Sequence, residues 1–224
     1  MSKDIAITAA NLSFCYENNK EIISNVNLTL YSGETAALAG ENGAGKTTLG
    51  KLLTGILKPS EGVITVFGDD AGRLSLSDIG QKIGYCFQNP DLQLFASSVE
   101  DEICFGLKYR GFDNEYIETV KEELLNLFEI DHLRHAFPLN LSRGEKRRVV
   151  LAACLALGPL YLILDEPTAG LDADRINVLN EVLDKLRQKG IGILIISHNE
   201  DFIKSNSNRM LRLHRGTITD DYYI

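Results

Sequence analysis

A glycine-rich segment constrains this chain more than any other feature of its sequence. Residues 40–47 read G-E-N-G-A-G-K-T and match the phosphate-binding pattern G-x-x-x-x-G-K-[ST]. A short apolar run at residues 34–39 precedes the segment, and a helical pattern over about residues 46–57 follows it. Glycines let successive backbone N–H groups point at phosphate oxygens, and the helix start adds partial positive charge. The segment therefore predicts a nucleotide-binding loop between a strand and a helix, in which Lys46 reaches the phosphates and Thr47 ligates Mg²⁺.

Two adjacent carboxylates follow a second apolar run. Residues 160–164, L-Y-L-I-L, predict a buried strand that ends at Asp165 and Glu166. Ligands of open α/β sheets bind at the carboxyl ends of the strands. An acidic pair after a strand is, by itself, more often the start of a solvated loop. Beside a phosphate loop, we instead expect Asp165 to hold Mg²⁺ and Glu166 to act as the general base on water.

A histidine also follows an apolar run. Residues 193–197 predict a further buried strand, and His198 comes directly after it. A single histidine in such a place is more often an ordinary surface or core residue. Near a phosphate loop, its imidazole could donate a hydrogen bond to the γ-phosphate or hold the attacking water.

The order of the patterns indicates the architecture. Strand patterns dominate up to about residue 88, helical patterns occupy residues 89–158, and strands alternate with helices from 159 to 224. Ser142 and Glu145 form a capping box at the start of one helix. We expect one α/β domain of the P-loop NTPase type with an N-terminal antiparallel β part. Residues 1–88 and 159–224 would form the nucleotide-binding core, and 89–158 a helical insertion.

Composition excludes several functional classes. The chain has 224 residues, with 23 Lys+Arg against 31 Asp+Glu and a net charge of −8, which argues against a protein that neutralises nucleic-acid phosphates. No run approaches the roughly 18 apolar residues of a membrane helix. Residues 1–4 are not followed by an apolar signal core, which argues against export. The four cysteines and the His132/His135 pair lack metal-site spacing, so we expect buried, reduced thiols and no metal at the histidines.

The ordered motifs resemble those of the ATP-binding subunits of ABC transporters, over nearly the whole chain. Residues 141–145, L-S-R-G-E, resemble the signature, and Asp172 resembles the D-loop aspartate. Gln88 is similar to the Q-loop glutamine, and His198 to the switch histidine. The resemblance implies that Tyr16 stacks on adenine and that the ATP phosphates are held by Gly40, Glu41, Asn42, Gly43, Ala44, Gly45, Lys46, Thr47 and Thr48.

The resemblance also implies an ABC-type fold and a mechanism. ATP and Mg²⁺ are the expected cofactors, with Thr47, Gln88 and Asp165 around the metal and with Glu166, His198 and Gln88 as the catalytic group. Two such domains would pair head to tail, as a homodimer or a heterodimer. Each would contribute Ser142, Gly144, Glu145 and Asp172 to the ATP held by the other. ATP would close the dimer, and its hydrolysis would open it.

Residues 86–95, C-F-Q-N-P-D-L-Q-L-F, resemble the Q-loop region of the energy-coupling-factor importers of vitamins and transition-metal ions. This resemblance implies a transmembrane coupling subunit as partner, and a place on the cytoplasmic face of the membrane. Asp91, Glu100, Asp101 and Glu102 would offer that subunit a negative docking surface. The simpler alternative is a solvated acidic helix.

The signature departs from the family pattern. Arg143 stands where the family has a glycine, and Glu145 stands where it has a glutamine. The first alternative is therefore a nucleotide-binding partner whose composite site is weak in a heterodimer. A second is a soluble ABC ATPase of DNA repair or translation, which the acidic charge disfavours. The chain continues only briefly after a predicted hairpin at 210–219, so pairing is not expected to need a long C-terminal extension.

Overall fold

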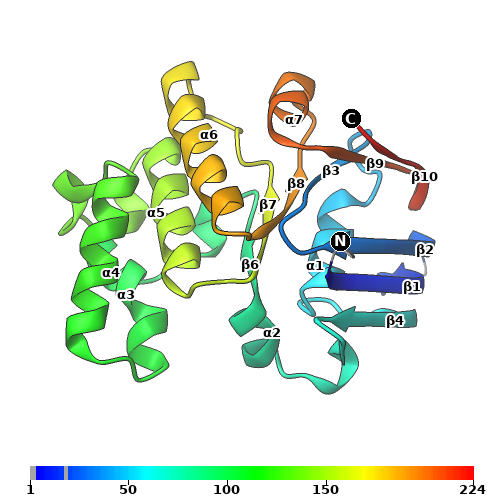
Figure 1. Cartoon of the computed structure of the whole chain (residues 1–224), viewed down its shortest axis with the longest axis horizontal. Coiled ribbons are helices and arrows are strands. Elements are labelled where there is room, and N and C mark those ends of the chain that lie inside the picture. The colour runs from blue at the N-terminus through cyan, green and yellow to red at the C-terminus, as the bar shows by residue number, and fades with distance from the viewer. Residues whose placement is uncertain (1–3, 18–19) are drawn as a thin grey trace.

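A computed structural model describes residues 4–17 and 20–224. Residues 1–3 lie outside this range, and they belong to the segment 1–4 from which no export is expected. The described chain forms two sheets, one antiparallel and one mostly parallel, flanked by helices (Figure 1). This confirms the mixed α/β fold with an antiparallel N-terminal part.

The antiparallel sheet contains four strands in the order β2-β1-β4-β5. Strand β1 (Ile5–Cys15) pairs with β2 (Glu21–Tyr31) and with β4 (Glu61–Val66), and the short β5 (Asp69–Asp70) pairs with β4. Side chains of β2 alternate between buried and exposed positions toward its end, because one face of the sheet packs on the core.

The second sheet has six strands in the order β10-β9-β3-β8-β7-β6. Strands β3 (Thr35–Ala39), β6 (Ile83–Cys86), β7 (Tyr161–Asp165), β8 (Gly192–Ile196) and β9 (Arg209–His214) run parallel, and β10 (Thr217–Tyr223) is antiparallel to β9. Every residue of β7 and β8 is buried, as expected for parallel strands covered on both faces. The parallel strands therefore present their carboxyl ends at one edge.

Helices connect these strands. Helices α1 (Lys46–Leu53) and α2 (Leu76–Lys82) precede β6, and α6 (Ala173–Gln188) and α7 (Glu200–Asn206) come after β7 and β8. Helices α3 (Val99–Tyr109), α4 (Asn114–Leu127) and α5 (Arg143–Ala156) lie between β6 and β7, on the side away from the antiparallel sheet (Figure 1). Single turns of 3₁₀ helix occur at Ala71–Arg73, Pro90–Leu92, Asp131–Leu133 and Pro138–Asn140.

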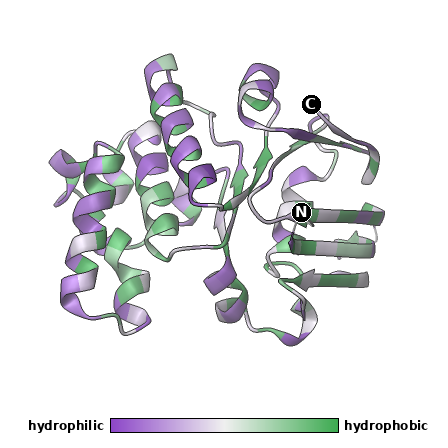
Figure 2. Cartoon of the chain, in the orientation of Figure 1, coloured by the Kyte–Doolittle hydropathy of each residue, from purple (hydrophilic) through white to green (hydrophobic). Residues whose placement is uncertain are grey.

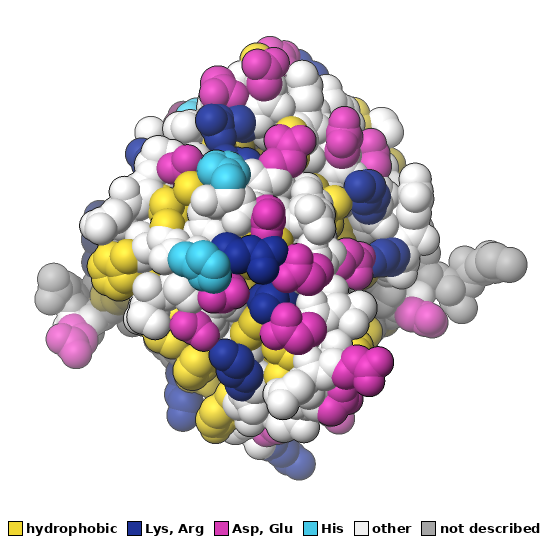
Figure 3. Space-filling model, turned by 90° about the vertical axis from the view of Figure 1, so that its left-hand side faces the viewer, with side chains coloured by type: hydrophobic (Ala, Val, Ile, Leu, Met, Phe, Trp, Pro, Cys, Tyr) yellow, Lys and Arg dark blue, Asp and Glu magenta, His cyan; other side chains and the backbone are white. Residues whose placement is uncertain are grey.

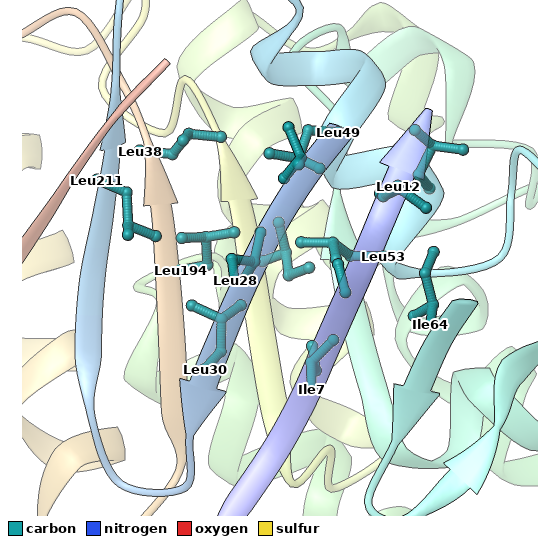
Figure 4. Packing of buried hydrophobic residues seen from close by; sticks show 14 of the residues in the cluster. Ile7, Leu12, Leu28, Leu30, Leu38, Leu49, Leu53, Ile64, Leu194 and Leu211 are labelled. Atoms are coloured by element: carbon teal, nitrogen blue, oxygen red, sulfur yellow. The ribbon is translucent and has the colours of Figure 1, made fainter. Parts of the chain in front are cut away.

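Two main hydrophobic clusters hold these layers together. One joins α1 to both sheets and includes Leu30, Leu49 and Leu194, which lie within one packed layer (Figure 4). The other joins β7 and β8 to α3–α6, through residues such as Phe128 and Leu183. Strands β7 and β8 are strongly hydrophobic, whereas α6 is largely hydrophilic outside its buried stripe (Figure 2). The second cluster is continuous from the helices to the sheet, and the division at residues 89 and 158 stays a prediction.

Some boundaries differ from those expected from the sequence. Helix α1 ends at Leu53 rather than near residue 57, because Gly55 turns the chain with a φ of 70°. Helices α2 and α7 were not anticipated. Within the described part of the chain, none of the helices has the length and apolar character needed to cross a membrane.

Candidate functional site

The carboxyl ends of four neighbouring parallel strands bring the predicted site residues to one edge. The register pairs Leu38 of β3 with Ile196 of β8, and Cys86 of β6 with Leu164 of β7. The segments that follow β3, β6 and β7 meet around a cavity of about 420 Å³. Its lining comprises Tyr16, Lys20, Ile22, Asn42, Gly43, Gly45, Lys46, Thr47, Thr48, Gln88, Asp165 and Glu166.

The phosphate loop is held in a conformation that requires glycine at two positions. A Cβ on Gly40 would lie 2.2 Å from the carbonyl oxygen of Leu213 in β9. Gly45, the N-cap of α1, has a φ of 102°, and a Cβ there would lie 2.9 Å from Ile23. Larger residues would push the loop away from β9 and β2, so the curled backbone depends on both glycines.

The turn between β9 and β10 also supports this loop. The backbone N–H of Gly216 donates to the carbonyl of Ala44 at 3.1 Å, and the N–H of Ser24 donates to the carbonyl of Gly216 at 2.9 Å. The phosphate loop is therefore tied to the hairpin at the end of the chain and, through it, to β2.

Lys46 is directed along the loop and is only 8% exposed. Its Nζ donates hydrogen bonds to the carbonyl oxygens of Gly40, at 2.7 Å, and Glu41, at 3.0 Å. The hydroxyl groups of Tyr16 and Thr48, which also line the cavity, lie 3.3 Å apart. The Tyr16 side chain, 45% exposed, leaves an aromatic surface open beside the loop.

Asp165 is deeply buried at the end of β7, and only 1% of its surface is exposed. Burial raises the pKa of its carboxyl, and the hydroxyls of Thr47 and Tyr85 oppose this shift. Tyr85 donates a hydrogen bond to Oδ2 at 3.0 Å. Oδ1 has no hydrogen-bond partner of normal geometry among the described residues. An unpaired carboxylate oxygen beside a threonine hydroxyl fits Mg²⁺, which prefers oxygen ligands.

Glu166 has an unusual backbone conformation, and its carboxylate has two polar partners. Its φ is 51°, in the left-handed region that residues other than glycine seldom adopt. Oε1 lies 2.8 Å from Nδ1 of His198, and Oε2 accepts from the Ser197 hydroxyl at 3.3 Å. The Glu166 side chain is 7% exposed and that of His198 is 68% exposed. The carboxylate is thus fixed at the cavity wall, while the imidazole remains open to solvent.

One buried arginine joins Glu166 to Gln88. Arg147 of helix α5 is 4% exposed. Its Nη1 donates to the carbonyl oxygen of Glu166, and its Nη2 donates to that of Gln88 at 2.8 Å. Gln88 itself is exposed and lines the cavity.

The start of helix α5 forms the predicted capping box. The Ser142 hydroxyl accepts from the Glu145 N–H at 3.4 Å, and the Glu145 carboxylate accepts from the Ser142 N–H at 2.8 Å and from its hydroxyl at 2.6 Å. These hydrogen bonds from Ser142 lower the pKa of Glu145. A carboxylate therefore already occupies part of the helix start at which the sequence predicts an anion site.

Glu145 also lies beside Asp172. Both residues line a cavity of about 360 Å³ together with Arg148 and Arg175, and this cavity shares no lining residue with the one at the phosphate loop. Asp172 caps helix α6 and accepts from the N–H of Arg175 at 2.9 Å.

The predicted docking carboxylates all have partners within the chain. Asp91 pairs with Lys146 at 2.7 Å, Asp101 with Lys108 at 3.0 Å, and Glu100 with His135 at 3.0 Å. Glu102 was expected on the same surface, and this expectation was wrong. Glu102 is only 5% exposed, because its carboxylate faces into the fold and accepts hydrogen bonds from the backbone N–H groups of Phe95 and Ala96.

Comparison with known proteins identifies the family. The sequence profile of the family described as ABC transporter matches residues 23–169. The chain belongs to the ABC transporter family of ATP-binding domains. It is 36% identical over 215 residues, 96% of its length, to an ABC transporter ATP-binding protein of Caldanaerobacter subterraneus. An ABC transporter ATP-binding protein of Pyrococcus furiosus is 35% identical over 205 residues, and the match covers 78% of that protein.

Solved structures agree with this assignment. The ABC domain resembles cbiO1 of Clostridium perfringens, part of the ABC transporter complex cbiONQ, with a TM-score of 0.87, 31% identity and coverage of 99% and 89% of the two chains. A dimeric ATP-binding cassette in a post-hydrolysis state shares the fold, with a TM-score of 0.88 at 22% identity. The chain spans 34–38% of the length of three of its curated relatives.

The ABC domain brings together only part of the predicted site. Tyr16, the phosphate loop, Gln88, Asp165 and Glu166 meet at one cavity. His198 joins them through Glu166, but it lines a second cavity of about 340 Å³ together with Gly40 and Glu41. The signature residues and Asp172 lie apart from the phosphate loop of the same ABC domain.

Three contacts of the site were missed from the sequence. They come from Tyr85, Ser197 and Arg147, and each reaches Asp165 or Glu166 from another element. Tyr85 and Ser197 lie on or after strands that neighbour β7. Their positions follow from strand order and register, which the one-dimensional pattern does not give.

Proposed function

We propose that this chain binds and hydrolyses ATP as a subunit of a membrane importer of the energy-coupling-factor type. The observation that carries the proposal is the convergence of Lys46, Thr47, Asp165 and Glu166 on one cavity. The likeness to cbiO1, part of the ABC transporter complex cbiONQ, supports the transporter class. The cargo of the importer is not specified by any residue described above, because it would be chosen by the membrane component.

The phosphate loop would bind the triphosphate. The Lys46 ammonium, held at the loop by two carbonyl groups, would pair with the β- and γ-phosphates, and the open face of Tyr16 would stack on adenine. Mg²⁺ would be held by Thr47, Asp165 and Gln88, and would neutralise charge on the phosphates.

Glu166 would act as the general base. Its carboxylate lines the cavity and is fixed by the Ser197 hydroxyl and by His198. It would accept a proton from the attacking water. His198, which donates or accepts at Nδ1 toward Glu166, would keep Glu166 oriented and leave its other nitrogen to contact the γ-phosphate.

The ATP site would be completed by a second domain. Ser142, Gly144, Glu145 and Asp172 lie apart from the phosphate loop of their own chain, and a helix N-terminus is suited to bind a phosphate. In a head-to-tail dimer these residues would face the partner's nucleotide. ATP would then hold the dimer closed, and hydrolysis would release it.

The surface next to the Q-loop would receive the membrane subunit. Asp91, Glu100 and Asp101 lie here, but each is paired internally, so we assign the main contact to aromatic residues beside them. Phe95, Phe105 and Tyr109 are 61%, 49% and 79% exposed, and the Phe95 and Phe105 rings are 4.7 Å apart.

The end of the molecule formed by the helices carries interspersed charges of both signs, with hydrophobic side chains gathered toward one edge (Figure 3). Exposed aromatic side chains next to such charges suit a protein interface.

Light scattering on the Glu166→Gln chain, with and without ATP, tests this proposal. We expect a monomer that becomes a dimer when ATP and Mg²⁺ are added, since the nucleotide persists without hydrolysis. An unaltered chain that neither binds ATP nor hydrolyses it would overturn the proposal.

A second function is favoured by the signature. The Glu145 carboxylate occupies the start of α5, and Arg143 packs its side chain over Gly170, 3.2 Å from a Cβ built there. Both features would weaken a composite site built from this signature. The chain could therefore serve as one half of a heterodimer, with a partner that supplies an unaltered signature. A chain that binds ATP but pairs only with such a partner would support this function.

A further inference from the structure

Helix α5 carries a charged residue where packing requires none. Gly144, Arg147, Leu151 and Cys154 are buried along one face of the helix. An apolar side chain would complete this face at lower cost, because a buried guanidinium loses its hydration. No carboxylate among the described residues forms an ion pair with Arg147, and its buried Nε has no hydrogen-bond partner there. The hydrogen bonds of the Arg147 guanidinium go to two backbone carbonyl groups.

These two carbonyl groups belong to the residues that the proposed function places at the phosphates. Nη1 donates to the carbonyl of Glu166 and Nη2 to that of Gln88, at 2.8 Å. The two carbonyls lie on different segments, one after β7 and one after β6. The N–H donors of a guanidinium have a fixed planar arrangement. The single Arg147 guanidinium therefore sets the distance between the carbonyls of Glu166 and Gln88.

The Glu166 backbone needs such a restraint. Its φ of 51° is sterically unfavourable for a residue with a side chain. Its N–H donates to the carbonyl of Ile196 at 2.8 Å, and its carbonyl accepts from Arg147. Both ends of the residue are held, so the carboxylate is aimed at His198 and the cavity rather than at solvent.

We infer that Arg147 is a positioning residue, which ties the signature helix to the backbones of Glu166 and Gln88 in the same chain. Arg147 lies on the second turn of the helix that begins after Ser142. A shift of this helix, caused by phosphate binding at its start, would be transmitted through Arg147 to Glu166 and Gln88. The signature used by one nucleotide site would thereby adjust the base of the other. This inference rests on the proposed function, which gives Glu166 and Gln88 their roles.

The test compares Arg147→Met and Arg147→Lys with a matched control, Arg110→Met. Arg110 is half-buried and also donates to two carbonyls, those of Leu157 at 3.2 Å and Gly80 at 3.0 Å, and none of these three residues lines the cavity at the phosphate loop. The purified full chain is assayed for phosphate release, for binding of ATP, and for amide hydrogen exchange in peptides that contain Gln88 or Glu166.

We expect Arg147→Met to lower kcat about tenfold or more, because misplacement of a catalytic group by about 1 Å has effects of this size. The ATP dissociation constant should stay within about twofold, since the phosphate loop is intact. Exchange should rise in peptides with Gln88 and Glu166. Arg147→Lys should give an intermediate kcat, because one ammonium cannot fill both positions of the fork. Arg110→Met should lower thermal stability without changing kcat or exchange at these peptides.

Two results would overturn the inference. One is unchanged hydrogen exchange at Gln88 and Glu166 in Arg147→Met. The other is a loss of kcat that Arg110→Met matches at equal thermal stability. The Glu166→Gln chain separates this inference from the proposed function. If Glu166→Gln retains full turnover, the proposed function is wrong. If it loses turnover while Arg147→Met does not, only the role of Arg147 is wrong.

Discussion

Nδ1 of His198 lies 2.8 Å from Oε1 of Glu166, and this contact joins the segments after two neighbouring parallel strands. The carboxylate is buried and the imidazole is mostly exposed. The pair therefore has one member fixed inside the cavity and one that faces solvent, where a second protein domain or a nucleotide can reach it.

Glu166→Gln should reduce steady-state phosphate release by about 10²–10⁴-fold, the usual contribution of a general base. The ATP dissociation constant should change little, because the amide keeps the size and the acceptor of the carboxylate. Phosphate release and equilibrium binding measure the two effects. As a control, Glu123→Gln alters an exposed carboxylate 3.9 Å from Lys189 and should leave both unchanged. Full turnover by Glu166→Gln would remove Glu166 from the role of base.

Lys46→Ala should weaken ATP binding by roughly tenfold to a hundredfold, since a hydrogen bond to a charged group contributes about 1.5–3 kcal/mol. Titration with a fluorescent ATP analogue measures the change. Lys58→Ala is the control, because Lys58 is exposed and lines a different cavity. Equal affinity of Lys46→Ala and the unaltered chain would contradict the binding role of the phosphate loop.

Asp165→Asn should raise Tm by roughly 2–4 °C at neutral pH while abolishing Mg²⁺-dependent turnover. Burial raises the pKa of Asp165, so its ionised form costs stability. This cost is complete above the raised folded-state pKa and disappears below the unfolded-state pKa of about 3.9. The gain in Tm should therefore shrink as the pH is lowered through that window. Thermal unfolding between pH 8 and pH 4 checks the trend, and a gain that grows on acidification would refute it.

Glu145→Gln should strengthen ATP-dependent pairing of the Glu166→Gln chain by about threefold to tenfold. The amide oxygen can keep the capping bond to Ser142, and the negative charge that would face a phosphate is gone. Light scattering at graded ATP concentrations measures the midpoint of pairing. If pairing is unaffected, the carboxylate at the start of α5 does not face the nucleotide of the partner.

Phe105→Ser should weaken assembly with the membrane subunit by about tenfold or more, as expected for an aromatic anchor. Charge reversal in Asp91→Lys and Glu100→Lys should have smaller effects, because both carboxylates already have partners in the chain. Co-purification with the membrane subunit is the assay, and Leu76→Ser, which alters a 60% exposed side chain on α2, is the control. Equal loss in Phe105→Ser and Leu76→Ser would place the docking surface elsewhere.

The phosphate loop could be predicted from the sequence because its requirements are local. The motif lies within residues 40–47, and the flanking strand and helix have clear periodicity. The capping box of Ser142 and Glu145 is local for the same reason. Such motifs can be recognised before the fold is known, although the close approach of Gly40 to Leu213 appears only in the structure.

Other features depend on contacts between distant segments. Glu102 was misplaced because its acidic neighbours suggested a solvated face, whereas its carboxylate binds the N–H groups of Phe95 and Ala96 within the fold. Helix α2 was missed because it is short, although Ser75 and Asp78 form a capping box at its start. The contacts of Arg147 to Glu166 and Gln88 join three segments, and no short motif encodes them.

The tie between the phosphate loop and the β9–β10 hairpin has a practical consequence for anyone who labels or fuses this protein. Gly216 is hydrogen-bonded to Ala44, and Gly40 lies close to the backbone of Leu213. A peptide tag inserted in this turn would therefore distort the phosphate loop and inhibit the protein, although the turn is distant from the loop in the sequence. A fluorophore on the outer surface of α4 would avoid this problem, because α4 packs against α3 and α5 and none of its residues lines the cavity at the loop. Random insertion libraries should accordingly show intolerance at residues 213–217, comparable to that of the phosphate loop itself.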